Sequence, residues 1–376
     1  MRLTNGKAIR AVLLFAPLVF TGCGGGSGSE DGNGNNTGTL ATPASAPAAG
    51  IAHAYAYVAD DFASTVSGYS ISMTTGQLTP LGTVEARSRP VTVNIHPDGK
   101  FAYVTNVFEN GVSAYRINPA TGALALLGVT EHLGANIAAK IAVDASGRFL
   151  YMAINYAHDS VPFPPPQVPQ EIATYRIDPD TGELTLTSTL VIGRHITSII
   201  VPPAGNVAYV ASPASLSAYA IDAVTGSLSR VAEVQVNMFR VQAHPSGMFA
   251  YVETTSEVIA YGLDPASGTL TPVGTPVPSG VVAVHPGGNF VYVASSAAVS
   301  IYRVDAASGA LVPAGASAPP SDLGPFVFDP SGKFAYIGAG SIQTYSVDPA
   351  TGALTPVGTP VARSSLALSI ATASII

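Results

Sequence analysis

The sequence has a single cysteine and no tryptophan, and only 10% of its 376 residues are charged. One cysteine cannot form an intramolecular disulfide, so the fold has to be stable without one. The absence of tryptophan excludes the repeat classes that a tryptophan–aspartate signature defines. Beyond the amino-terminal segment no apolar run reaches about 18 residues, which excludes a transmembrane helix in that part of the chain.

Basic residues are also scarce: the chain has 16 Lys and Arg against 23 Asp and Glu, a net charge of −7. Three of the basic residues, Arg2, Lys7 and Arg10, lie in the first ten positions. Without them the remainder carries 13 basic and 23 acidic residues, a net charge of −10. A nucleic-acid partner is therefore excluded, because phosphates require a basic surface.

The amino-terminal segment has the pattern of an export signal. After the three basic residues comes an apolar run at 11–20, too short to span a bilayer as a helix, and then Thr21-Gly22-Cys23. This ending resembles the lipobox of bacterial lipoproteins, although Phe20 stands where leucine is usual. The resemblance implies that residues 1–22 are a signal peptide and that Cys23 is diacylated.

The lipoprotein hypothesis also explains the only cysteine; the alternative is a stray cysteine in a conventional signal peptide. We expect an exported lipoprotein of the bacterial cell envelope, anchored in the membrane through Cys23. Gly24 follows the cysteine, which in enteric bacteria favours the outer membrane, and the choice of membrane stays open. Residues 23–50, rich in Gly, Ser and Pro, are predicted to be a flexible tether.

A seven-fold repeat occupies the remaining sequence, residues 51–376. Each repeat has a first tyrosine within an apolar strand pattern, a second tyrosine, and a glycine that follows Thr or Ser. The first tyrosines are Tyr57, Tyr103, Tyr151, Tyr209, Tyr251, Tyr292 and Tyr336, spaced 41–58 residues apart. The second tyrosines are Tyr69, Tyr115, Tyr175, Tyr219, Tyr261, Tyr302 and Tyr345. This period is typical of four-stranded propeller blades.

One unit illustrates the blade, because residues 91–95, 101–105, 112–117 and 123–127 each have a strand pattern with turn residues between them. The first repeat lacks the strand that should precede it, and the chain ends on an additional strand at 365–370. We therefore predict an all-β protein: one seven-bladed β-propeller of four-stranded antiparallel blades. The carboxyl-terminal strand completes the first blade, three strands plus one.

Recurring residues in the repeat favour structure over chemistry. Tyrosines at repeat positions are interpreted as packing between blades. Asn118, Asp178, Asp264 and Asp348 precede Pro-x-Thr/Ser-Gly and are interpreted as Asx turns rather than calcium ligands. His96, His244 and His285 share one turn position on different blades, so they ring the protein instead of converging on a metal. We expect neither a metal nor a cofactor.

Loop lengths indicate which face carries function. Two hairpins per blade have constant lengths, whereas the loops of the opposite face vary, and variable loops on a rigid scaffold usually bind ligands. The longest loop is the Pro-rich insertion at 156–170, which contains Tyr156, His158 and Asp159. A tolerated surface insertion is the alternative explanation, and its role stays open.

Positive charge gathers on the same variable face. Arg87, Arg89, Lys140, Arg194, Arg240 and Arg363 lie in crossovers or near the start of inner strands. Inner strands converge on the axis, so an anionic ligand at the channel mouth is one hypothesis and local balance of an acidic surface is the other. The candidate ligand-binding residues are Arg89, His132, Lys140, Tyr156, His158, Arg194, His195 and Arg240.

The segment 96–106, His-Pro-Asp-Gly-Lys-Phe-Ala-Tyr-Val-Thr-Asn, resembles the repeat of the lactonase-type seven-bladed propeller family, which is related to YVTN repeats. The resemblance extends over residues 54–376. That family includes 6-phosphogluconolactonases and carboxymuconate cyclases. It implies an Arg-His pair opening a central blade, a glutamate after the following Tyr-Val strand and an upstream histidine.

Only the first of these features is present. Arg194 and His195 match the pair and are the catalytic candidates, but Pro213 stands at the glutamate position and Lys140 ends the segment where a histidine is expected. The general acid–base partners of the family are therefore missing there. We expect a monomeric propeller that binds a small ligand, such as an anion, or a protein partner without catalysing a reaction. The alternative is a 6-phosphogluconolactonase-like lactone hydrolase or cyclase with rearranged residues.

The lipid anchor generates the first testable prediction. Without an acylated cysteine the protein loses its only membrane contact, so Cys23→Ala should move it from the membrane fraction to soluble or unprocessed protein. Fractionation and immunoblotting of wild type and variant measure this. Mature Cys23→Ala protein that stays in the membrane fraction would contradict the lipoprotein assignment.

Overall fold

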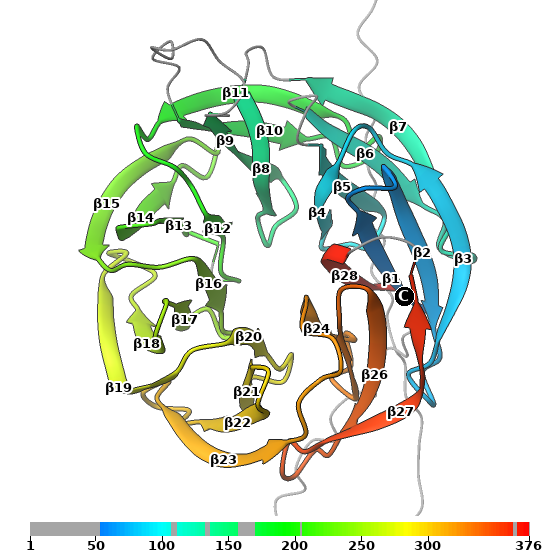
Figure 1. Ribbon diagram of the computed structural model, residues 1–376. Coiled ribbons are helices and arrows are strands. Elements are labelled where there is room, and N and C mark those ends of the chain that lie inside the picture. The colour runs from blue at the N-terminus through cyan, green and yellow to red at the C-terminus, as the bar shows by residue number, and fades with distance from the viewer. Residues whose placement is uncertain are drawn as a thin grey trace, which may run out of the picture. The chain divides into compact units, whose positions relative to one another are not determined.

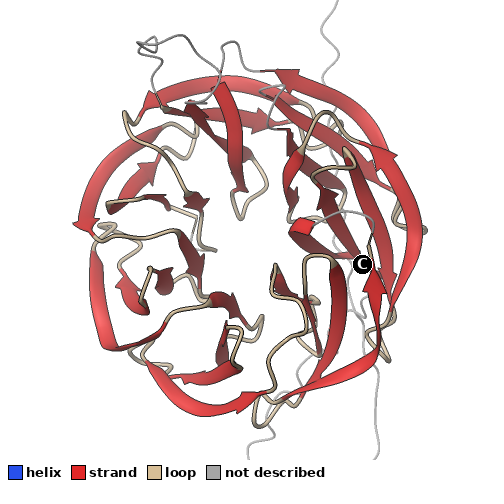
Figure 2. Ribbon diagram, viewed as in Figure 1, coloured by secondary structure: helices blue, strands red, loops and turns tan. Residues whose placement is uncertain are grey.

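The described residues of the computed structural model form twenty-eight strands in seven separate antiparallel sheets of four strands each. Figures 1 and 2 show these sheets arranged around a common centre. The structure describes residues 53–106, 111–131, 136–156, 170–203, 205–363 and 367–375. The chain divides into two units, residues 1–48 and 49–376, and every described residue belongs to the second. The predicted signal peptide and tether lie outside the described residues. Within those residues, no helix is long and apolar enough to cross a membrane.

Each blade has an innermost and a second strand. The inner strands, which surround the centre in Figure 1, are β28 (Ala367–Ile375), β4 (Pro90–Ile95), β8 (Asn136–Val143), β12 (Ser198–Ile200), β16 (Arg240–Ala243), β20 (Val281–Val284) and β24 (Phe326–Phe328). The second strands are β1 (His53–Asp60), β5 (Phe101–Asn106), β9 (Phe149–Tyr156), β13 (Val207–Ser212), β17 (Phe249–Glu253), β21 (Phe290–Ala294) and β25 (Phe334–Ile337).

A third and an outer strand complete each blade. The third strands are β2 (Thr65–Ile71), β6 (Gly111–Ile117), β10 (Glu171–Ile177), β14 (Ser215–Ile221), β18 (Glu257–Leu263), β22 (Val299–Val304) and β26 (Ser341–Val347). The outer strands are β3 (Leu78–Glu85), β7 (Leu124–Glu131), β11 (Leu184–Val191), β15 (Leu228–Gln235), β19 (Leu270–Pro278), β23 (Leu311–Ser317) and β27 (Leu354–Ala362). The predicted fold class and blade composition are confirmed.

The ring closes as expected. The first sheet has the order β28-β1-β2-β3, so the last strand of the chain pairs with the first. Tyr57 of β1 lies opposite Ala371 of β28 in an antiparallel register. Closure in this way pairs both edges that a linear array would expose.

The first tyrosine of each repeat is fully buried between blades, on a second strand that is buried on both faces. Five of these phenols donate a hydrogen bond to the carbonyl of the turn glycine in the next blade. The pairs are Tyr57–Gly122 (2.8 Å), Tyr103–Gly182 (3.1 Å), Tyr251–Gly309 (3.3 Å), Tyr292–Gly352 (2.8 Å) and Tyr336–Gly76 (2.9 Å). The interpretation of the tyrosines as inter-blade packing is confirmed.

The turn glycines are required for two reasons, as Gly182 illustrates. Its φ is +77°, a conformation that side chains with a Cβ rarely adopt. An added Cβ would also lie 2.5 Å from Cδ1 of Phe101, which packs against this turn from the preceding blade. The glycine therefore lets one blade approach the next closely.

A buried ion pair joins the last and first blades near the closure. Arg363, between β27 and β28, pairs with Asp60 at the end of β1, and their side chains are 2% and 5% exposed. Asp60 also accepts hydrogen bonds from Ser67 (2.6 Å) and Thr65 (3.3 Å). Removing one partner of a buried pair leaves the other charge uncompensated in the interior.

We expect Arg363→Met to lower the free energy of unfolding by about 3–5 kcal/mol, because Asp60 loses its buried cation. Urea unfolding followed by far-ultraviolet circular dichroism or tyrosine fluorescence measures the change, since the chain has no tryptophan. The matched control is Arg87→Met, which removes an exposed pair with Glu131 at 3.5 Å and should cost less than about 1 kcal/mol. Equal effects of both substitutions would contradict a stabilising role for the buried pair.

Candidate functional site

The inner strands of all seven blades line one central cavity of about 540 Å³. Along an inner strand the side chains alternate, so polar Thr92 and Asn94 flank buried Val93. In the same way Arg240 and Gln242 flank Val241, which is buried. The cavity wall is therefore polar, while the intervening residues pack between blades.

Several of these polar groups bond to the inner-strand edge of the next blade. Ser369 Oγ accepts a hydrogen bond from Val93 N at 3.3 Å, and Asn94 Nδ2 donates to Ile141 O at 3.1 Å. An inner strand has a partner on one side only, so its remaining backbone groups need such bonds or water. Part of the polar lining is therefore structural.

Two cations line the cavity, Lys140 on β8 and Arg240 on β16. Burial lowers the pKa of the Lys140 ammonium, and the nearby positive charge of Arg240 lowers it further. Within the part of the chain that the structure describes, neither side chain has a carboxylate within 4 Å. The cavity thus holds two neighbouring positive charges that no described ion pair neutralises.

The other basic residues predicted on this face are paired instead. Arg89 holds Asp61 through two hydrogen bonds of 2.6 and 2.7 Å, Arg87 pairs with Glu131, and Arg363 pairs with Asp60. Arg87 therefore balances an exposed acid, whereas Arg89 and Arg363 neutralise the buried carboxylates of Asp61 and Asp60. Only Lys140 and Arg240 of the six predicted basic residues line the central cavity.

Arg194 and His195 do not line the cavity. Arg194, in the crossover between β11 and β12, pairs with Glu233 of β15 and donates to Ser215 Oγ at 2.7 Å. His195 is exposed, and desolvation lowers the pKa of its imidazole. The Arg-His pair that the family resemblance implied is thus not part of the cavity wall that Lys140 and Arg240 line.

The remaining candidates fall outside what the structure describes. His132, His158 and Cys23 belong to segments beyond the described residues. Tyr156 is the last residue of β9, where its backbone lies opposite Asn136, and its side chain is not described. Their predicted roles stay predictions.

A buried carboxylate that sequence reasoning missed lies beside Arg240. Glu253 ends β17, and its Cα is the cross-strand partner of the Arg240 Cα. Its Oε1 accepts a hydrogen bond from Val282 N at 3.3 Å, and the residue is 8% exposed. Desolvation raises its pKa, against the opposing effects of the Arg240 charge and the Val282 bond.

The sequence contained a signal for Glu253. It directly follows Tyr251-Val252, and Arg240 opens the inner strand of the same blade. The family resemblance places the expected glutamate one blade earlier, at Pro213 between β13 and β14. An arginine followed by a Tyr-Val-Glu strand therefore occurs here in the fifth blade.

A smaller cavity of about 300 Å³ adjoins the central one, because Val281 lines both. Its wall contains Glu253, Phe239 and Leu323. Carboxylate and cations therefore lie on adjoining cavities of the same region. This arrangement can bind an anion and places a titratable base near it.

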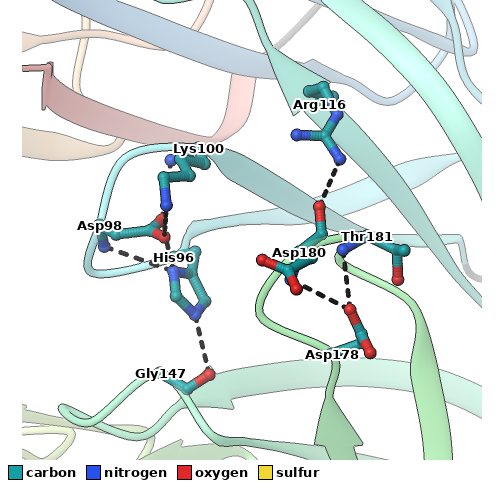
Figure 3. A network of polar contacts seen from close by, with 8 residues as sticks. All are labelled: His96, Asp98, Lys100, Arg116, Gly147, Asp178, Asp180 and Thr181. Carbon is teal, nitrogen blue, oxygen red and sulfur yellow. Dashed lines mark hydrogen bonds and ion pairs between the residues drawn. The ribbon is translucent and has the colours of Figure 1, made fainter. Parts of the chain in front are cut away.

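The opposite face carries structural contacts (Figure 3). His96 bonds through Nδ1 to Asp98 (2.6 Å) and through Nε2 to the carbonyl of Gly147 in the next blade (2.8 Å). His244 and His285 likewise contact the carbonyls of Gly288 and Gly332. These ring nitrogens are engaged in bonds between blades.

The predicted Asx turns are confirmed on this face. Asp178 Oδ1 accepts hydrogen bonds from the backbone of Asp180 (3.0 Å) and Thr181 (2.8 Å), as Figure 3 shows, and these bonds lower its pKa. Arg116 of the preceding blade donates to Asp180 O at 2.6 Å. The constant hairpins thus fasten blades together, which explains their invariant lengths.

Comparison with solved structures finds the same fold in proteins of low sequence identity. A proposed 6-phosphogluconolactonase from Bacteroides fragilis has a TM-score of 0.72 at 20% identity, covering 88% of this chain and 100% of that one. One from Bacteroides uniformis has a TM-score of 0.72 at 18% identity, covering 85% and 99%. The periplasmic gluconolactonase of Pseudomonas aeruginosa has 0.72 at 18%, covering 86% and 100%.

No curated protein sequence matches the chain. A family model described as lactonase, 7-bladed beta-propeller, matches it at residues 46–154, 93–241 and 240–367. These segments overlap and together cover residues 46–367, which is the described ring except for most of β28, and its seven blades agree with that description. The chain therefore belongs to the lactonase family of seven-bladed β-propellers.

Proposed function

We propose that this propeller binds a small anionic molecule in its central cavity through Lys140 and Arg240. The observation that carries the proposal is their pairing state. Lys140 and Arg240 have no carboxylate partner among the described residues. The other four arginines predicted on this face all have one: Arg87, Arg89, Arg194 and Arg363. An anion between them would supply the missing partner.

The energetics support an anion at this position. Two like charges in a partly desolvated cavity repel each other, and the lowered pKa of Lys140 reflects both burial and the Arg240 charge. A bound carboxylate or phosphate offsets the repulsion and accepts charge-assisted hydrogen bonds from both groups. Arg240 offers a planar donor pair and Lys140 a compact charge, a combination suited to either anion.

The cavity has suitable dimensions and polarity. A volume of about 540 Å³ lies within the range typical of small-molecule sites, roughly 300–1,000 Å³. Gln242, Asn94 and Ser369 add polar groups on three other positions of the wall. These side chains can orient the uncharged part of a hydrophilic ligand by hydrogen bonds.

We further propose that the protein works outside the cytoplasm, held at a membrane through acylated Cys23. The support is the amino-terminal pattern of basic residues, apolar run and Thr21-Gly22-Cys23. A propeller of the same fold, the Pseudomonas aeruginosa gluconolactonase, is periplasmic. Residues 23–50, whose composition predicts a tether, would then link Cys23 to the propeller.

Lactone hydrolysis is the second candidate, and Glu253 is the observation that favours it. A raised pKa strengthens a carboxylate as a base. Glu253 would take a proton from water as the water oxygen attacks the lactone carbonyl carbon, with Arg240 or Lys140 stabilising the oxyanion. The ring C–O bond then breaks, and the leaving oxygen recovers the proton from Glu253, so that a hydroxy acid is released.

Anion binding is tested by calorimetric titration with 6-phosphogluconate. Lys140→Met and Arg240→Met should each weaken binding about 10-fold or more, because each removes a charge-assisted contact. Lys333→Met, which removes an exposed lysine beside a turn of the opposite face, should have no effect. Unchanged affinity in both cavity variants would refute the proposal.

The same titration has an expected pH dependence. Because the pKa of Lys140 is lowered, its ammonium loses the proton at lower pH than an exposed lysine. Affinity should therefore begin to fall, as pH rises, before exposed lysines titrate. Lys140→Met should flatten this decline, and an identical pH profile in wild type and variant would exclude Lys140 as the titrating group.

The lactonase candidate is tested by hydrolysis of 6-phosphogluconolactone. Binding without chemistry predicts a rate no faster than in buffer. Turnover above buffer that is lost in Glu253→Gln and kept in His195→Ala would establish the second candidate, since glutamine retains an acceptor for Val282 N but cannot act as a base. Turnover unaffected by Glu253→Gln would exclude Glu253 as that base.

A further inference from the structure

The smaller cavity presents exposed apolar side chains next to the cationic site. Phe239 is 56% exposed and Leu323 is 43% exposed, and both line this cavity. They come from two different crossovers, the one before β16 and the one before β24. Exposed apolar residues scattered singly need no explanation, but two that line one concave surface can bury a ligand's apolar part.

The position of Phe239 is tied to the cationic site by the backbone. Phe239 directly precedes Arg240, and its N donates to Glu253 O at 2.9 Å. Arg240 in turn lies opposite Glu253 in the β16–β17 pair. The apolar surface therefore begins one residue from a cavity-lining cation, and Val281 lines both cavities.

The charge between the two cavities also fits an amphipathic anion. Glu253 forms part of the wall of the smaller cavity, where an ionised carboxylate would repel the ligand. Because its pKa is raised, a larger fraction of Glu253 is neutral than of an exposed glutamate at the same pH. The positive charge of Arg240 offsets the negative charge of the ionised fraction. The remaining wall, with Thr254, Ser279 and Ser295, is uncharged.

We propose that the ligand is an amphipathic monoanion whose acidic group lies between Lys140 and Arg240 and whose apolar arm occupies the smaller cavity between Phe239 and Leu323. This inference rests on the proposed function and adds the ligand class. A fully hydroxylated acid would satisfy the cations but leave the two apolar side chains exposed. An apolar arm removes their surface from water, and affinity rises with the area buried.

Two monoanionic carboxylates test the inference on the purified protein, 4-phenylbutyrate with an aromatic arm and gluconate with a hydroxylated one. Calorimetric titration should give 4-phenylbutyrate at least about 5-fold higher affinity. Phe239→Ser and Leu323→Ser should each weaken 4-phenylbutyrate about 3- to 10-fold and leave gluconate unchanged. Arg240→Met should weaken both ligands.

The matched control is Val191→Ser, which removes a residue that is 59% exposed at the end of β11 and should change neither affinity. Equal binding of the two acids, or unchanged 4-phenylbutyrate binding in both Phe239→Ser and Leu323→Ser, would overturn the inference while anion binding itself stands. Undiminished 4-phenylbutyrate binding in Arg240→Met would also overturn it. If 4-phenylbutyrate, gluconate and 6-phosphogluconate all fail to bind, the proposed function itself is refuted.

Discussion

A buried tyrosine packs between each blade and the next, and at five of the seven boundaries its hydroxyl donates to a turn carbonyl of the neighbouring blade. In the pair Tyr103–Gly182 the phenol donates across the blade boundary, and Phe101 fills the space that the glycine leaves open. Burial raises the pKa of these phenols, so they remain neutral donors over the physiological range. Because the contact needs a glycine at positive φ and a tyrosine at fixed spacing, both recur around the ring.

This constraint separates the two faces of the ring. The hairpins that receive the tyrosines cannot change length without losing the contact, and His96 and Arg116 add further bonds between the same turns. The opposite face has no such requirement, so its loops vary. The central cavity lies between inner strands, where Lys140 and Arg240 come from blades that are far apart in sequence.

Charge pairing decides which basic residues are available to a ligand. Six basic residues share the variable face, and their positions in sequence do not distinguish them. Arg89 and Arg363 have carboxylate partners contributed by the first blade, and Arg194 has one from an outer strand. Such partners lie more than 20 positions away in the chain, so only the folded structure shows that Lys140 and Arg240 differ from the others.

The repeat by itself determined the fold class, the blade count and the closure by the carboxyl-terminal strand. These follow from spacing, alternation and turn chemistry, which are local properties that every unit repeats. The candidate site was predicted only in part: Lys140 and Arg240 were named, whereas Glu253 was missed and Arg194 does not line the cavity. Seven similar units supply seven equivalent positions for each functional side chain. Which of those positions converge on the axis, and which are neutralised by a neighbour, depends on contacts between distant residues, and only the tertiary structure decides them.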